Sequence, residues 1–255
     1  MAPRIWARSK DGSILYMSLT TEYIEGAIKV LEKGFYPRES ICRAINLASD
    51  KKAVAELNKL CLCVAEDGVS VIAVEKNTNT VCAVAINKLQ VPGNPEDDSF
   101  FAEFSKSCKS PLSRRLIQFM YEADASCDLF EHCKVDCLLE LMFLATLPEF
   151  GRRGIGFTIC EVTTEVARRL YLGENVKESL DGTELKLEPV PKLVAALFTA
   201  PQSQAIGRSA RWELAATVFF KDLFFDGKSF ASVLEETNRT SEVRFKCNKL
   251  DLLYF

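Results

Sequence analysis

The sequence contains a single histidine, His132, so imidazole ligands for a zinc site are scarce. Its ten cysteines form no Cys-x-x-Cys pair, and most of them stand singly within apolar runs, as in residues 60–64 and 81–83. In such runs cysteine serves as a small hydrophobic residue. We therefore expect reduced structural thiols in a reducing compartment, and neither disulfides nor a metal site.

Basic residues are not in excess either, because 32 lysines and arginines stand against 35 aspartates and glutamates, for a net charge of -3 at pH 7. A domain that binds nucleic acid normally carries a basic excess, so this class of protein is disfavoured. No apolar run approaches the ~18 residues that a membrane span needs, and the first residues lack the apolar segment of a signal peptide. We expect a monomeric, cytoplasmic protein that binds neither nucleic acid nor a membrane.

The chain does have ample apolar material for a core. With 255 residues, 48% of them hydrophobic, it can form one large α/β domain that covers residues 1–255. The apolar periodicity predicts strands at residues 14–19, 69–74, 81–85, 137–146, 193–198, 214–220 and 243–249. It predicts helices at residues 22–33, 40–48, 50–60, 112–125 and 154–172, and a short helix from Ser203. Surface insertions are expected at about 92–110 and 173–191. The antiparallel start and the later alternation of strands and helices predict a mixed central sheet flanked by helices on both faces.

The strand predicted at residues 137–146 leads into a glycine-rich turn, Gly151-Arg152-Arg153-Gly154-Ile155-Gly156, where a helix begins. The first amides of a helix lack partners within it and carry positive partial charge, so they bind phosphate groups. Glycines let a phosphate approach the backbone, and the two arginines add full charges. The turn matches neither Gly-x-Gly-x-x-Gly nor the Gly-Lys-Ser/Thr ending of a P-loop. It predicts a phosphate site of another kind, or else a turn used only for tight packing.

This segment resembles the GNAT superfamily of N-acetyltransferases, whose signature is a strand, then Arg/Gln-x-x-Gly-x-Gly/Ala, then a helix. Gly154 and Gly156 match the two glycines, whereas Gly151 stands where the family has arginine or glutamine. The resemblance implies the mixed sheet of that superfamily, acetyl-CoA as co-substrate and no metal. It also implies contacts with coenzyme A from the end of the strand and from the turn, at Leu144, Ala145, Thr146, Gly151, Arg152, Arg153, Gly154, Ile155 and Gly156.

Within that superfamily the N-terminal part is similar to the insect arylalkylamine N-acetyltransferase group, which carries Phe-Phe-x-Asp-Glu-Pro-Leu where this chain has Phe35-Tyr36-Pro37-Arg38-Glu39-Ser40-Ile41. The resemblance implies that Glu39 is the general base. In residues 197–203 that group places hydroxyl side chains near the thioester sulfur, which implies Ser203, and after it Thr199, as donors to the departing thiolate. Structural roles are also open, because Glu39 and Ser203 each stand where a helix N-cap is expected.

The resemblance implies direct transfer of an acetyl group from acetyl-CoA to a small primary amine of the arylalkylamine or polyamine type. An amine is mostly protonated at neutral pH, so a base must take its proton. A backbone N–H near residues 144–146 can stabilise the negative charge that develops on the thioester oxygen. Two alternatives stay open. The chain can be an acyltransferase for longer acyl-CoA or for amino acids, or a catalytically degenerate protein that binds acyl-CoA without turnover.

Overall fold

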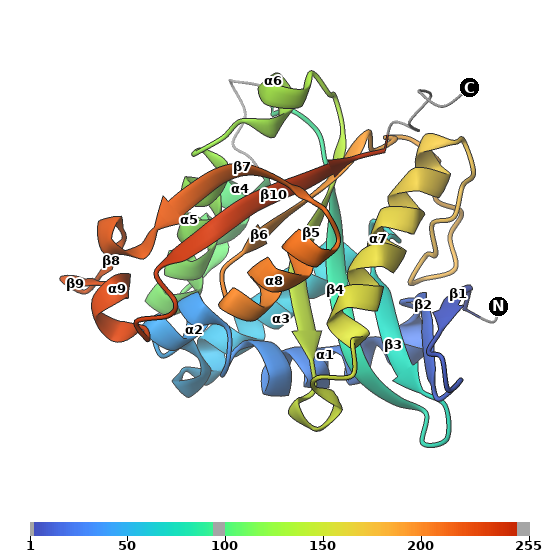
Figure 1. The fold of residues 1–255 in the computed structure, drawn as a ribbon, viewed down its shortest axis with the longest axis horizontal. Helices are drawn as coiled ribbons and strands as arrows, with labels where there is room; N and C mark the ends of the chain where they lie inside the picture. Colours follow the sequence, from blue (N-terminus) through green and yellow to red (C-terminus); the bar gives the residue numbers. More distant parts are fainter. Residues whose placement is uncertain (1–2, 94–99, 249–255) are drawn as a thin grey trace.

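An eight-stranded mixed sheet forms the centre of the computed structural model, which describes residues 3–93 and 100–248 (Figure 1). In chain order its strands are β1 (Ile5–Arg8), β2 (Ile14–Ser18), β3 (Val71–Glu75), β4 (Thr80–Gln90), β5 (Leu138–Thr146), β6 (Leu193–Phe198), β7 (Glu213–Phe219) and β10 (Thr240–Cys247). Across the sheet their order is β1-β2-β3-β4-β5-β6-β10-β7. A small ribbon of β8 (Phe224–Phe225) and β9 (Lys228–Ser229) lies outside this sheet. The sheet is of the mixed type that the sequence predicts.

Helices cover both faces of the sheet, and each face has its own apolar cluster. The helices are α1 (Ile24–Val30), α2 (Ser40–Ala44), α3 (Lys51–Ala65), α4 (Phe100–Ser107), α5 (Pro111–Asp124), α6 (Leu129–Cys133), α7 (Ile155–Tyr171), α8 (Pro201–Ser209) and α9 (Phe230–Val233). Residues of α1, α2, α3 and α5 share one cluster, whereas α7 packs on the opposite face with residues of β4 and β5 (Figure 1). Among the described helices none is long and apolar enough to cross a membrane.

The pairing of β5 with β6 is parallel, and it is short. It runs from Leu139, opposite Val194, to Leu141, opposite Ala196, whereas every other neighbouring pair in the sheet is antiparallel. Both strands continue beyond this register, so the last five residues of β5 have strand partners only on the β4 side. The two strands therefore lie side by side and then part.

The first helical segment differs from the single helix predicted at residues 22–33. It consists of a 3-10 turn (Thr21–Tyr23), α1 and a π-helical turn (Leu31–Phe35), so the chain stays helical through Gly34 instead of stopping there. A Cβ on Gly34 would approach the carbonyl oxygen of Thr146 to 2.9 Å. Glycine thus lets this turn pack directly against the end of β5, because any side chain would push the two backbones apart.

The two expected surface insertions have more structure than their composition indicates. Residues 92–110 include helix α4, whose Phe101 is buried, and residues 94–99 lie outside the described part of the chain. The segment 173–191 has neither helix nor strand, yet Val176 is only 3% exposed and the amide of Glu178 donates to the carbonyl of Gly68. Strand β1 was not predicted, because a four-residue edge strand carries little periodicity.

Candidate active site

The turn before α7 presents a row of free backbone donors. Arg152 and Gly154 adopt left-handed conformations, with φ of 60° and 75°, and the first amide that bonds back into the helix is that of Thr158, to the carbonyl of Gly154. Within the described residues, the amides of residues 152–157 donate to no other group. Successive amides in such a turn form a concave anion site, and the positive end of a long helix reinforces it. The predicted phosphate loop therefore has the geometry that phosphate binding needs.

The two arginines of this turn lie in different surroundings. Arg153 donates to the Ser13 hydroxyl over 3.1 Å, and its guanidinium lies 5.5 Å from the ring centre of Phe150. Arg152 is exposed and is the freer of the two to meet a phosphate. Gly151 has an extended conformation that any residue adopts, with φ of -61°, so the missing arginine or glutamine of the family signature is not replaced by a special backbone conformation.

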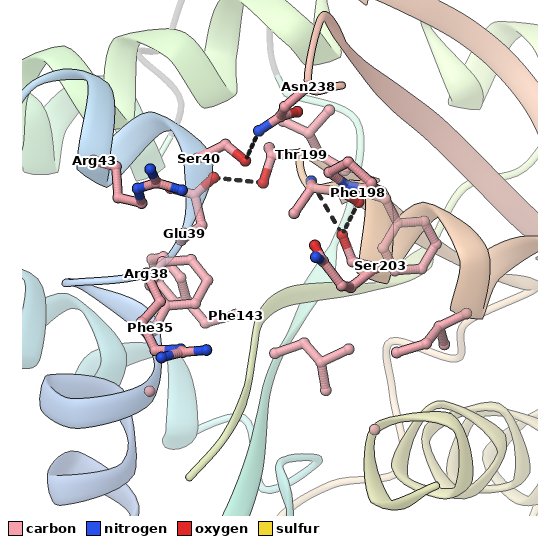
Figure 2. Close-up of a pocket in the computed structure, with 18 of the residues that line it drawn as sticks. Phe35, Arg38, Glu39, Ser40, Arg43, Phe143, Phe198, Thr199, Ser203 and Asn238 are labelled. Atoms are coloured by element: carbon pink, nitrogen blue, oxygen red, sulfur yellow. Dashed lines mark hydrogen bonds between the residues drawn. The ribbon is translucent and has the colours of Figure 1, made fainter. Parts of the chain in front are cut away.

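A cavity of about 620 Å³ opens where β5 and β6 part, and it has two halves. The half next to α7 is lined by the end of β5 and the start of α8, with Leu144, Thr146, Gly156, Ser203 and Ile206. The other half lies between α2, α5, β6 and the segment before β10, and is lined by Glu39, Arg43, Phe119, Glu140, Glu235 and Asn238 (Figure 2). Of the predicted coenzyme A contacts, Leu144, Thr146 and Gly156 line this cavity together with Glu39, whereas Ala145 and residues 151–155 are not part of its described wall. Ala145 points elsewhere and is buried in the core.

Glu39 is the N-cap of α2, and its carboxylate is held by three donors. Oε1 accepts from the amide of Ile41 (2.9 Å) and Oε2 from the amide of Cys42 (2.7 Å), while the Thr199 hydroxyl also donates to Oε1 (Figure 2). A carboxylate has about four acceptor positions, so one remains for an amine or a water in the cavity. The capping role and the predicted catalytic role are therefore compatible in geometry.

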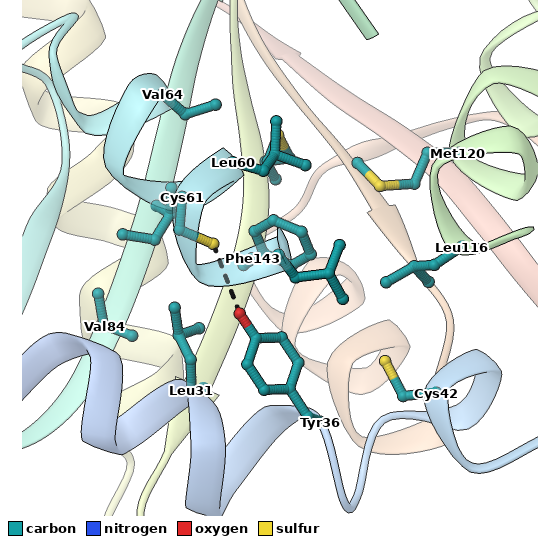
Figure 3. Close-up of a cluster of buried hydrophobic side chains, with 14 of the residues drawn as sticks. Leu31, Tyr36, Cys42, Leu60, Cys61, Val64, Val84, Leu116, Met120 and Phe143 are labelled. Carbon is teal, nitrogen blue, oxygen red and sulfur yellow. Dashed lines mark hydrogen bonds between the residues drawn. The ribbon is translucent and has the colours of Figure 1, made fainter. Parts of the chain in front are cut away.

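The segment that carries Glu39 is anchored in the core by Tyr36, which is almost fully buried (Figure 3). Its hydroxyl donates to Oδ1 of Asn58 over 3.0 Å and lies 3.8 Å from Sγ of Cys61, both on α3. The neighbouring Phe35 packs edge-on against Phe143 of β5, at 5.0 Å between ring centres. These contacts fix the π-helical turn and hence the start of α2, where Glu39 lies.

The two candidate hydroxyls occupy different positions. Thr199, directly after β6, donates its hydroxyl hydrogen to the carboxylate of Glu39 and so orients it. Ser203, in the first turn of α8, donates to the carbonyl of Ala200 (3.0 Å) and accepts from the amide of the same residue (3.2 Å). The N-cap of α8 is Ala200, so the expectation that Ser203 stands at the N-cap is wrong; Ser203 is at the third helical position, where its hydroxyl accepts from the N-cap amide. Ser203 also lines the half of the cavity next to α7.

Four further residues of the cavity wall were not anticipated from the sequence. Ser40 is buried and accepts from Nδ2 of Asn238 (2.5 Å), which ties α2 to the segment before β10. Arg43 pairs with Glu235 over 3.0 Å at the rim. Ser40 and Asn238 lie 198 positions apart in the chain, so no local pattern could have brought them together.

The most unusual member of the wall is Glu140, in the middle of β5 and only 5% exposed. Its Oε2 accepts from Nε2 of Gln90, and Asp124 at the end of α5 is its acidic neighbour. Burial raises the pKa of Glu140 from 4.5 to about 7. Burial, and then the charge of Glu140, raise the pKa of Asp124 well above its usual value. The sequence did offer a signal, because Glu140 is the one charged residue in the apolar run that predicts β5.

Within residues 3–93 and 100–248, no three histidine, cysteine, aspartate or glutamate side chains gather as metal ligands would. All ten cysteines are free thiols, and six of them are buried. The cysteines of the apolar runs therefore pack as core residues.

No protein-family model matches this chain, and no curated protein matches its sequence. Solved structures do match. Arylalkylamine N-acetyltransferase 2 from Aedes aegypti has a TM-score of 0.73 at 18% identity, over 92% of this chain and 99% of that one. The polyamine N-acetyltransferase of Drosophila melanogaster, described as forming N-acetylagmatine, has a TM-score of 0.70 at 14% identity, over 92% and 99%. The C-terminal condensation domain of Ebony, in complex with beta-alanyl-dopamine, has a TM-score of 0.63 at 14% identity, over 92% and 98%. The chain therefore has the α/β fold of the GNAT N-acetyltransferases, as its sequence predicts.

A carboxylate placed in the phosphate loop should prevent coenzyme A from binding. We expect Gly154→Glu to abolish the binding of acetyl-CoA in calorimetry, because the added charge would repel the pyrophosphate. Gly173→Glu is the matched control, since Gly173 also has positive φ (83°) and open space around it but lies after the opposite end of α7. Equal affinity of the two variants would show that this turn does not hold the phosphates.

The raised pKa of Glu140 predicts an unusual dependence of stability on pH. Because the folded protein holds this proton more tightly than the unfolded chain, the free energy of unfolding should fall as pH rises from about 4.5 through about 7. The shift corresponds to about 3 kcal/mol, and Asp124 acts in the same direction. Urea unfolding between about pH 5 and about pH 8 should show this loss of stability in the native protein, and Glu140→Gln should lose less stability over the same range.

Asp11 and Asp181, with pKa lowered to about 2, change the stability of the protein only at lower pH. Parallel profiles for the two proteins would contradict the prediction.

The hydroxyl of Tyr36 should contribute measurably to stability. Tyr36→Phe keeps the buried ring but removes the bond to Asn58, so the free energy of unfolding in urea should fall by about 1 kcal/mol. Tyr23→Phe is the comparison, because its hydroxyl bonds to Asn79 at an exposed position and its removal should change stability much less. If both variants unfold at the same urea concentration as the native protein, the hydroxyl of Tyr36 is not an anchor.

Proposed function

We propose that the protein is an acyl-CoA-dependent N-acyltransferase that moves an acetyl group from acetyl-CoA to a small primary amine of the arylalkylamine or polyamine type. The observation that carries the proposal is one cavity that is lined by Glu39 and by Gly156, a residue of the turn with the unpartnered amides. Solved structures with the same fold are named as arylalkylamine and polyamine N-acetyltransferases.

Acetyl-CoA fits the half of the cavity next to α7. The amides of residues 152–157 and the side chain of Arg152 would hold its pyrophosphate, and the gap between β5 and β6 would take the pantetheine arm. Residues 142–146 of β5 have no strand partner on the β6 side. Their inward amides can therefore bond to the pantetheine and stabilise the charge that develops on the thioester oxygen.

Glu39 faces the same gap from the opposite side. It would accept a proton from the incoming amine, directly or through a water, as the amine nitrogen bonds to the thioester carbon and the carbon–sulfur bond breaks. Thr199 holds the carboxylate in place by donating to it. Ser203 lies in the half next to α7. After turning from the carbonyl of Ala200, it would pass a proton to the departing thiolate while taking one from a water molecule, which in turn would take up the proton that Glu39 releases. Direct transfer needs no covalent intermediate on the protein.

A catalytically degenerate acyl-CoA-binding protein is the second candidate. Glu39 favours this candidate, because two backbone amides and the Thr199 hydroxyl already donate to its carboxylate. Such bonds are those of a helix N-cap and need no catalytic role. The turn lacks the arginine or glutamine of the family signature at Gly151, which reduces the contacts to phosphate. A longer acyl-CoA donor, or an amino acid as acceptor, is the alternative within the enzyme class.

Replacing the predicted base separates the two candidates. Glu39→Gln keeps an oxygen that can cap α2 but cannot take a proton, so turnover at neutral pH should fall by about 10²–10⁴-fold while acetyl-CoA binding changes little. The loss should shrink as pH rises, because more of the amine is then already neutral. The assay is release of free thiol from acetyl-CoA with a panel of amines.

The control is Asp50→Asn, the same chemical change at the N-cap of α3, where Asp50 accepts from the amide of Lys52. It should cost about as much stability as the change at Glu39, up to about 1 kcal/mol, with normal turnover. Normal turnover in Glu39→Gln would remove Glu39 from the chemistry. Binding of acetyl-CoA by a native protein that acetylates no amine would favour the degenerate protein.

A further inference from the structure

A second cavity, of about 250 Å³, continues the acceptor half of the active-site cavity beneath α5. It lies between the end of α5, the start of α6 and the strands β5, β6 and β10. Glu140 and Leu197 line both cavities. Glu140 therefore lies at the boundary between the two cavities.

The charged residues that line the extension are acidic. Asp124, Asp128 and Glu140 belong to its wall, and among the described residues that line it there is no lysine, arginine or histidine. Asp128 is engaged as the N-cap of α6. Lys88 lies opposite Glu140 in the ladder between β4 and β5, and its charge acts to lower the pKa of Glu140, although its ammonium group also pairs with Asp67 over 2.7 Å.

The pair formed by Glu140 and Asp124 is poorly satisfied. Gln90 is the only donor to Glu140 within the described residues, and none of them donates to the carboxylate of Asp124. Placing the half-buried carboxyl group of Asp124 beside the buried one of Glu140 is costly, because each disfavours ionisation of the other, and Lys88 offsets this only in part, since the pKa of Glu140 remains raised. A cation bound between them would remove that cost.

The surroundings of the pair suit an alkylammonium group. The remaining wall is largely apolar, with Leu129, Leu138, Ala195, Leu197 and Val243, which can cover a methylene chain. The rings of Tyr121 and Phe130 also face the extension and offer aromatic contacts to a cation.

The register of β5 and β6 gives an estimate of the distance between Glu140 and the proposed base, Glu39. Thr199, which contacts Glu39, is four residues beyond Ala195, and β6 lies beside β5 with Ala195 opposite Glu140. At about 3.3 Å per residue, the backbone positions of Ala195 and Thr199 are about 13 Å apart along the strand, before the reach of the side chains is counted. A linear molecule with a cationic group at each end can span such a distance.

We propose that Glu140 and Asp124 bind the distal ammonium group of a linear aliphatic diamine or polyamine, while its other amino group meets Glu39 and is acetylated. The inference rests on the proposed N-acyltransferase function, and it narrows the acceptor from primary amines in general to dications. Glu140 and Asp124 are then specificity-determining residues, since they touch the end of the acceptor that does not react.

The test compares amines that differ only in the distal charge. Hexamethylenediamine is paired with hexylamine and putrescine with butylamine, and spermidine extends the series. The native protein should show kcat/KM about 10- to 100-fold higher for hexamethylenediamine than for hexylamine, as a charged hydrogen bond provides. The preference should grow from putrescine to the longer members, because the shorter chain does not reach the pair.

Glu140→Gln and Asp124→Asn should each remove most of this ratio, whatever happens to the absolute rate. The control is Glu122→Gln, also on α5, whose carboxylate pairs with Arg115 over 3.1 Å outside both cavities. That variant should keep the native ratio. The two variants change different elements, β5 and α5, so the test remains decisive if one variant folds poorly. Melting temperatures identify such a variant. A purely structural role of the pair would change the rates with both amines alike and leave the ratio unaltered.

Calorimetry separates failure of this inference from failure of the proposed function. In the presence of coenzyme A, the native protein should bind hexamethylenediamine more tightly than hexylamine, and Glu140→Gln should not. That result in a protein without acetylation activity would support the dication site and refute the proposed enzyme. Acetylation of both amines with equal kcat/KM would overturn the dication site and leave the enzyme standing.

Discussion

The parting of β5 and β6 is the constraint on which the rest of the site depends. Two parallel strands stay together through only three paired positions, and beyond them the backbone of β5 needs other partners. Everything on either side is arranged around this gap. The turn before α7 brings its free amides to one end, and the π-helical turn brings Glu39 to the other. A continuous ladder between the strands would close the cavity, so the fold gives up backbone hydrogen bonds to make a binding site.

Glu39 reaches this gap because several individually weak contacts hold one short segment in place. Gly34 allows the π-helical turn to touch the end of β5, and Tyr36 locks the next residues onto α3. Thr199 then joins the carboxylate to β6 across 160 positions of sequence. The carboxylate that caps α2 is thus also the link between a helix on one side of the gap and a strand on the other. Its capping and its proposed proton transfer use different lone pairs, so neither role excludes the other.

The sequence predicts the parts of this structure that local patterns encode. The apolar run of β5, the glycine turn and the amphipathic α7 follow directly from periodicity and helix-start chemistry, and their order along the chain predicts the mixed sheet. The phosphate loop could be placed for the same reason. Local patterns fail for α4 and β1, which are short, and for the segment 173–191, whose acidic composition hides the buried Val176. They also fail for the wall made by Asn238 and Arg43, because only the tertiary fold brings these residues to α2 and the cavity.

Glu140 is a charged residue at a position where the apolar pattern of β5 predicts a hydrophobic one. A charged residue inside an apolar strand contradicts the rule that every position of a strand buried on both faces should be apolar. Such a conflict between local sequence and fold is expected at functional sites more than elsewhere, because the cost in stability must be offset by some other gain. Here Glu140 lines two cavities next to a second carboxyl, and its pKa remains raised although Lys88 lies opposite it in the ladder. Packing alone would be served better by leucine at this position, which would fill the same space without a desolvation cost. The proposed dication site accounts for the acid, because a ligand there would add positive charge beside it.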